Sequence, residues 1–138
     1  MERDQRASLV AAYWRHYTAR SDDECPADHI CLNFPADAPL RDVRTLAGPP
    51  VPTRLTVRLW VHSDPRPDIL HLMIVRPPSA EQPYWRAIRA GNVGRPGEEV
   101  CVETALLTQE GVELPPGVRA RGEQTCLRIP RDVIRRPA

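Results

Sequence analysis

The sequence predicts a mainly β fold, a sandwich or partly open barrel of about six short strands with one N-terminal amphipathic helix; an α+β fold is the alternative. Apolar residues recur at helical spacing only before Arg20. Beyond that point 16 prolines interrupt the chain, and they exclude long helices because proline lacks an amide hydrogen. Short apolar runs with two-residue alternation lie between the prolines, which is typical of strands.

The length of 138 residues favours a single domain spanning residues 1–138. A chain of this size buries one modest core and is too short for two. The expected organisation is a helix over residues 4–20, a β-rich body over residues 29–129 and a basic tail over residues 130–138.

The helix is expected because apolar residues three and four positions apart share one helical face. These residues are Ala7, Val10, Ala11, Trp14 and Tyr17. Asp4 is suited to cap the first turn, and the basic residues near Arg20 oppose the negative end of the helix dipole. Trp14 and Tyr17 are expected to pack the helix onto the β-rich body.

Strands are expected in the body wherever β-branched and apolar residues form short runs bounded by turn residues. The expected strands are His29–Phe34, Arg54–His62, Asp68–Arg76, a weaker one at Tyr84–Ala90, Glu98–Leu107, and Val118–Ile129 with an interruption around Gly122.

The second and third of these strands are expected to form a hairpin. Every second residue of the first strand is a leucine or valine, and Leu70, Leu72 and Ile74 form the matching row on the second. Pairing Leu59 with Leu72 brings the two apolar rows onto one face. This register also places Trp60 opposite His71. Because Trp60 lies on the reverse face together with other apolar residues, the hairpin is expected to be covered on both sides.

The charge of the chain is nearly balanced. All 19 basic residues are arginine and 18 residues are acidic, which gives a formal net charge of +1. Such a balance argues against protein-wide attraction to nucleic acid or an anionic membrane, so any anion site is expected to be local. The absence of lysine is most simply explained by a GC-rich coding genome.

The sequence predicts a cytoplasmic protein without a membrane partner. The N-terminus lacks the features of a signal peptide, and no apolar run approaches the roughly 18 residues that a membrane helix requires.

A metal site is one interpretation of the stretch from Asp22 to Cys31. Cys25, His29 and Cys31 offer three zinc ligands, and Cys101 or Cys126 is a candidate fourth. The spacing is not that of a paired-cysteine zinc knuckle, so the alternative is a solvated acidic loop without a cofactor.

The cysteines allow two further interpretations. Cys101 and Cys126 lie on alternating strand positions from which they can face each other in a disulfide. In an intracellular protein, reduced thiols that pack between strands are the expected alternative.

The leading hypothesis for function is a non-enzymatic protein-binding or adaptor domain. Aromatic residues and arginine are enriched where proteins meet, and Tyr84, Trp85 and Arg86 form the expected anchor. The first alternative is a small enzyme that uses zinc, or His71 beside Trp60 and the acids of the hairpin connection. The second is a nucleic-acid contact protein that uses the basic residues Arg128, Arg131 and Arg135.

Overall fold

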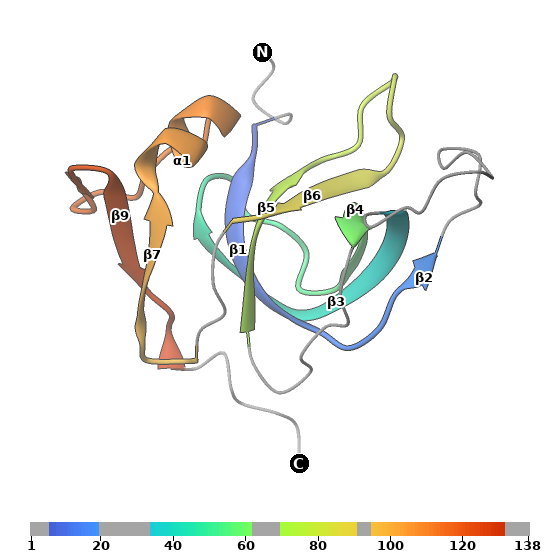
Figure 1. The fold of residues 1–138 in the computed structure, drawn as a ribbon, viewed down its shortest axis with the longest axis horizontal. Helices are drawn as coiled ribbons and strands as arrows, with labels where there is room; N and C mark the ends of the chain where they lie inside the picture. The colour runs from blue at the N-terminus through green and yellow to red at the C-terminus, as the bar shows by residue number, and fades with distance from the viewer. Residues whose placement is uncertain (1–5, 20–33, 62–69, 91–94, 132–138) are drawn as a thin grey trace.

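The computed structural model describes residues 6–19, 34–61, 70–90 and 95–131, shown in colour in Figure 1. They form β1 (Ser8–Trp14), β2 (Thr18–Ala19), β3 (Phe34–Ala47), β4 (Leu55–Val61), β5 (Leu70–Arg76), β6 (Trp85–Arg89), β7 (Glu99–Glu103), α1 (Thr104–Glu110), β8 (Ala120–Arg121) and β9 (Gln124–Arg128). The prediction of a mainly β fold is confirmed. No helix in the described part of the chain is long and apolar enough to cross a membrane.

Five strands close into a small barrel, which occupies the right-hand side of Figure 1. Neighbours follow the order β1, β5, β6, β4, β3, and the pairing of β3 with β1 completes the ring. Strands β4 and β6 are parallel, whereas the other neighbouring pairs are antiparallel. The last barrel strand in the chain therefore inserts between the two that precede it.

The expected N-terminal helix is wrong, because residues 8–14 and 18–19 are strands β1 and β2. All seven residues of β1 are buried, since its two sides face two different cores. A strand buried on both sides reads as a continuous apolar run, and so short a run does not distinguish a strand from a helix. Trp14 consequently lies in the barrel interior instead of on a covering helix.

The predicted strand His29–Phe34 overlaps β3 only at Phe34. Pro35 and Pro39 are residue types typical of turns, so the sequence predicts no strand beyond that point. Both prolines lie in the half that pairs with β4, opposite Trp60 and Thr56. Further along, Asp42 has a φ of 51° at a register shift between β1 and β3. A bulge of this kind increases local twist, which helps a long strand follow the curve of a barrel.

The positions of β4 and β5 confirm two expected strands, but the hairpin between them is wrong. Strand β6 lies between β4 and β5 and pairs with both. Leu59 is buried inside the barrel, whereas Leu72 is buried in a separate core on its outside. His71 therefore lies opposite Ala12 on β1, not opposite Trp60.

Two apolar cores divide the described residues. The barrel interior contains Val10, Ala12, Trp14, Ala36, Ala38, Leu40, Val43, Val57, Leu59, Val61, Met73, Val75 and Ala87. The second core lies where the outer side of β1 and β5 meets β7, β9 and α1, and it includes Leu9, Ala11, Tyr13, Leu70, Leu72, Ile74, Val100, Val102, Leu107, Val112, Leu127 and Ile129.

The second sheet has the order β7, β9, β8 and stands on the left of Figure 1 with α1. The strand expected over Glu98–Leu107 is correct only for its first half, because α1 begins at Thr104. The helix ends at Glu110, and Gly111 follows it with a φ of 74°, the left-handed conformation common after a last helical turn. The interruption expected around Gly122 is the turn between β8 and β9.

Candidate ligand-binding face on the barrel

The outer side of β3, β4 and β6 is the part of the barrel that the second sheet leaves uncovered among the described residues. We call it the barrel face, and its outward residues are Pro35, Asp37, Pro39, Thr56, Arg58, Trp60, Arg86 and Ile88. The residues between them in the sequence fill the barrel interior. Because successive side chains of a strand point to opposite sides, this alternation fixes which residues form the face.

Two arginines of the barrel face and one on the neighbouring strand β5 lie side by side. Arg58 on β4 is paired with Arg86 on β6, which is paired in turn with Arg76 on β5. Neighbouring strands are about 4.8 Å apart, and like charges placed opposite each other destabilise a sheet. We call these three residues the arginine row; their repulsion makes the row a favourable place for anions.

Carboxylates neutralise the two ends of the arginine row but not its centre. Asp37 accepts a hydrogen bond from Nε of Arg58 at 3.1 Å. Arg76 donates to the main-chain oxygen of Glu110 at 2.7 Å, and its Nε lies 3.6 Å from the Glu110 carboxylate. The buried Nε of Arg86 has no hydrogen-bond partner among the described residues. An unsatisfied buried donor costs about 1–3 kcal/mol, so an added acceptor is favoured there.

Arg58 is held in place by an aromatic ring as well as by Asp37. Its guanidinium carbon lies 3.7 Å from the centre of the Tyr84 ring, within the range of a cation–π interaction. Burial disfavours the charged form of Arg58, but hydrogen bonds and charge interactions with Asp37 and Tyr84 outweigh it and raise the pKa. Arg58 is therefore a fixed cation on the face.

An apolar row runs beside the arginine row. Trp60 and Ile88 are the next outward residues on β4 and β6, and they are 56% and 40% exposed. Residues of both rows, with Tyr84 and Glu110, line a cavity of about 280 Å³. Exposed large apolar side chains that gather at one place mark binding surfaces. The barrel face thus combines a flat aromatic surface with adjacent guanidinium groups.

The structure brings together some of the residues expected to bind a partner and separates others. Tyr84 and Arg86 line the cavity on the barrel face, but Trp85 packs toward the barrel interior. Arg128 is exposed on the second sheet, where it donates to the main-chain oxygen of Gly97 at 2.5 Å. Arg131 is exposed beyond β9, and Arg135 lies outside the described residues.

The candidate zinc ligands Cys25, His29 and Cys31 lie outside the described residues, so the zinc site stays a prediction. His71, expected beside Trp60, is instead buried and contacts Trp14 edge-on, with ring centres 5.4 Å apart. The expected histidine site on a hairpin is therefore not formed.

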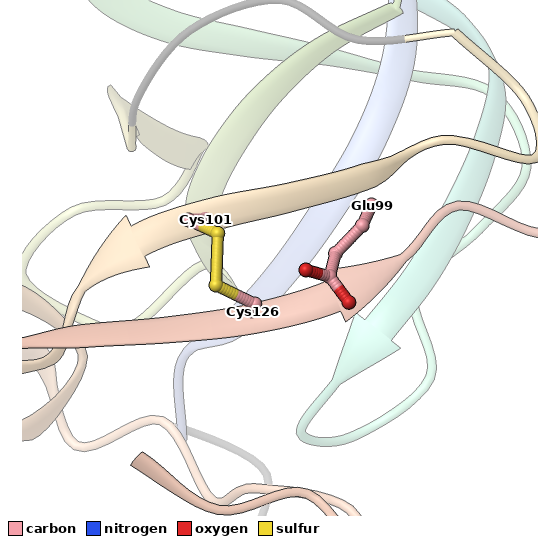
Figure 2. Close-up of side chains that lie close together, drawn as sticks. All are labelled: Glu99, Cys101 and Cys126. Carbon is pink, nitrogen blue, oxygen red and sulfur yellow. A yellow bond between two sulfur atoms is a disulfide. The ribbon is translucent and has the colours of Figure 1, made fainter. Parts of the chain in front are cut away.

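Cys101 and Cys126 are joined by a disulfide, so their interpretation as reduced packing thiols is wrong. They lie directly opposite each other on β7 and β9, and Figure 2 shows the bond beside the Glu99 carboxylate. Potential ligand atoms of the three residues lie within 4.8 Å of one another. Because zinc is bound by thiolates, the bonded sulfurs do not serve as metal ligands.

The disulfide bears on the expected location of the protein. Disulfides persist in oxidising compartments and are rare in the cytosol. The cytoplasmic location stays a prediction, and this bond argues against it.

Replacing both cysteines with serine, Cys101→Ser and Cys126→Ser, is expected to lower the free energy of unfolding. The bond joins residues 25 positions apart, and a closed loop of that length is worth about 3.5 kcal/mol through the entropy of the unfolded chain. Cys101 is exposed and Cys126 is half-buried, and serine is close to cysteine in size, so the two replacements leave little cavity. Denaturant unfolding measures the loss, and a reductant should destabilise the native chain but not the double variant. Equal stability of the native protein and the double variant under oxidising conditions would contradict the assignment of the disulfide.

Comparison with known proteins found no matching family model, no matching curated protein and no matching solved structure. The function has to be inferred from the side chains of this chain.

The alternation of residues along β4 predicts part of the barrel face, but the incorrect hairpin gave this strand the wrong neighbour. Thr56, Arg58 and Trp60 alternate with buried Val57, Leu59 and Val61, which places Trp60 on the same side as Arg58. Assigning β5 as the partner of β4 hid the neighbouring Arg86 and Ile88, which come from a strand predicted only weakly.

Proposed function

We propose that the chain is a non-enzymatic binding protein and that its ligand is a single strand of nucleic acid lying across the barrel face. The observation that carries the proposal is the arginine row beside exposed Trp60, with the buried Nε of Arg86 lacking an acceptor. Single strands are bound by aromatic side chains that stack on bases and by basic side chains that follow the phosphates. Trp60 supplies the first and Arg86 the second.

The distribution of charge supports this ligand. The described residues of segments 6–19, 34–61 and 70–90 contain nine arginines and three acidic residues, whereas residues 95–131 contain five arginines and six glutamates. The small net charge of the whole chain therefore conceals a positive excess on the described barrel. A basic surface on one face is the electrostatic feature expected of a nucleic-acid-binding protein.

The topology supports the same face by analogy of fold. The strand order, with the last barrel strand inserted parallel to the third, resembles that of OB-type barrels, which bind oligonucleotides on the face of their second and third strands. The corresponding strands here are β3 and β4. Fold alone does not assign function, so the side chains on the face carry the argument.

Fluorescence anisotropy with a labelled oligo(dT) of roughly 16 nucleotides tests the proposal. Affinity is expected to fall steeply with added salt, because bound phosphates displace counterions. Trp60→Ala should weaken binding about tenfold or more, since stacking contributes about 1–3 kcal/mol per base. Arg86→Gln should weaken binding and reduce the salt dependence by about one charge.

The matched controls are Trp60→Phe, which retains a stacking ring, and Arg119→Gln, which removes an exposed arginine close to β8. Both should bind nearly as tightly as the native protein. The proposal fails if the native protein does not bind at low salt, or if Trp60→Ala binds with native affinity.

A protein partner is the second candidate, and the exposure of Trp60 and Ile88 beside half-buried Tyr84 favours it. Tryptophan, tyrosine and arginine dominate the energetics of protein interfaces. Binding centred on apolar contact is screened little by salt, so a partner of this class should keep its affinity as the ionic strength rises.

A further inference from the structure

A second cavity, of about 430 Å³, lies where the middle of β3 meets the start of β4 and the link after β1. Arg15, His16, Arg41 and Arg54 line it, with Leu40 and Leu55 among its apolar residues. None of its described lining residues is acidic. We call this cavity the arginine pocket.

Strand pairing explains why basic residues distant in the sequence meet in the arginine pocket. Arg41 on β3 lies opposite Tyr13 on β1, two residues before Arg15. On the other side of β3, Leu40 lies opposite Leu55, which follows Arg54 directly. Because β3 runs between β1 and β4, it gathers cationic residues from three segments at one place.

Arg41 is positioned in the pocket by an aromatic ring. Its guanidinium carbon lies 5.3 Å from the centre of the Tyr13 ring, a cation–π contact that fixes the side chain. Its Nε and one terminal nitrogen are nonetheless buried without a hydrogen-bond partner among the described residues. Charged donors that are positioned and desolvated but lack an acceptor favour the binding of an anion.

We propose that the arginine pocket binds the phosphate group of an organic phosphate. A guanidinium presents paired donors that match the oxygens of phosphate, and Arg15 and Arg54 add charge from either side of Arg41. The cavity is larger than a phosphate ion, and its Leu40 and Leu55 walls suit the carbon part of the ligand. Because its cationic residues are separate from the arginine row, the pocket does not depend on the function proposed above.

The phosphate has two possible sources. Thr56 and Pro39 line the pocket, and each lies two residues, about 7 Å, along its strand from Arg58 and Asp37 respectively on the barrel face. A nucleic-acid strand that follows β4 would therefore deliver a backbone phosphate to the pocket. The other source is a free phosphorylated compound that occupies the pocket by itself.

Isothermal titration calorimetry of the full chain with pyrophosphate at low salt tests for the shared chemistry. Arg41→Gln is expected to weaken pyrophosphate binding about tenfold or more, because it removes the preformed donors. Arg54→Gln alters an exposed residue and should weaken binding several-fold without affecting folding. Arg119→Gln is the matched control, on an exposed arginine outside the pocket, and should bind as the native protein does.

Oligo(dT) binding by the same variants identifies the source. Weakened binding of both probes by Arg41→Gln and Arg54→Gln assigns the pocket to a strand phosphate, whereas weakened binding of pyrophosphate alone assigns it to a free compound. Trp60→Ala should affect only the oligonucleotide, which separates the pocket from the barrel face. If the native protein does not bind pyrophosphate, or if Arg54→Gln and a folded Arg41→Gln both bind it with native affinity, the proposal is overturned.

Discussion

Replacing Leu9 with glutamate is expected to unfold the protein. Leu9 is fully buried in the second core, on the side of β1 opposite to that of Val10, which fills the barrel. The substitution removes a buried leucine and leaves an unpaired buried charge, with a combined cost of more than about 4 kcal/mol. Such a loss is a large fraction of the roughly 5–15 kcal/mol by which an ordinary domain is stable. Circular dichroism and denaturant unfolding provide the measurement.

Thr18→Glu is the control for this substitution. A helical N-terminus and a stranded one predict opposite answers as to which of the two variants is the less stable. In a helix that turns 100° per residue, position 18 lies on the same face as Trp14, and position 9 points away from it. In the structure Thr18 is exposed on β2 and Leu9 is buried. If the Leu9→Glu variant folds and the Thr18→Glu variant is destabilised, the N-terminal segment is a helix and β1 is not a strand of the barrel.

Gly48→Ala is expected to lower the free energy of unfolding by about 3 kcal/mol or more. Gly48 has a φ of 88°, and a Cβ there would lie 2.6 Å from the main-chain oxygen of Ala7 and 3.0 Å from the Cα of Ser8. These are backbone atoms of the segment that leads into β1, and they do not yield as a flexible side chain would. The turn after β3 therefore has to separate from β1, where Ser8 also donates a hydrogen bond to the main-chain oxygen of Pro49 at 2.5 Å.

Gly117→Ala isolates the cost of the clash at Gly48. Gly117 has nearly the same backbone angle, a φ of 85°, but nothing lies within 4 Å of the position of its Cβ. It should therefore lose only the roughly 1–2 kcal/mol of an unfavourable left-handed residue. Equal losses in denaturant unfolding would show that the turn at Gly48 does not lie against β1.

The strand at Leu55–Val61 was predictable from its period-two apolar pattern, and the strand at Leu70–Arg76 from a short apolar run between turn residues. Their pairing was not, because the sequence distance between them favours a hairpin and carries no information about an inserted strand. Strand β1 was missed for a related reason. Closure of the barrel buries both of its sides, and this removes the alternation that identifies a strand.

The candidate site was predictable only in part. Tyr84 and Arg86 were selected for their residue types, and both line the cavity on the barrel face. The arginine row depends on the insertion of β6, which places Arg86 between Arg58 and Arg76. The arginine pocket likewise depends on β3 lying between β1 and β4. Neither arrangement follows from spacing in the sequence, because each joins strands by pairing that only the closed barrel provides.

The most direct test of strand binding by the barrel face is a titration of the ¹⁵N-labelled protein with oligo(dT), followed through the indole signals of its three tryptophans. The signal of exposed Trp60 should shift progressively. The signal of Trp14 should stay in place, because its buried indole donates to the main-chain oxygen of His16 at 2.9 Å. An indole signal of Trp60 that does not move at saturating oligo(dT) would contradict the proposed face.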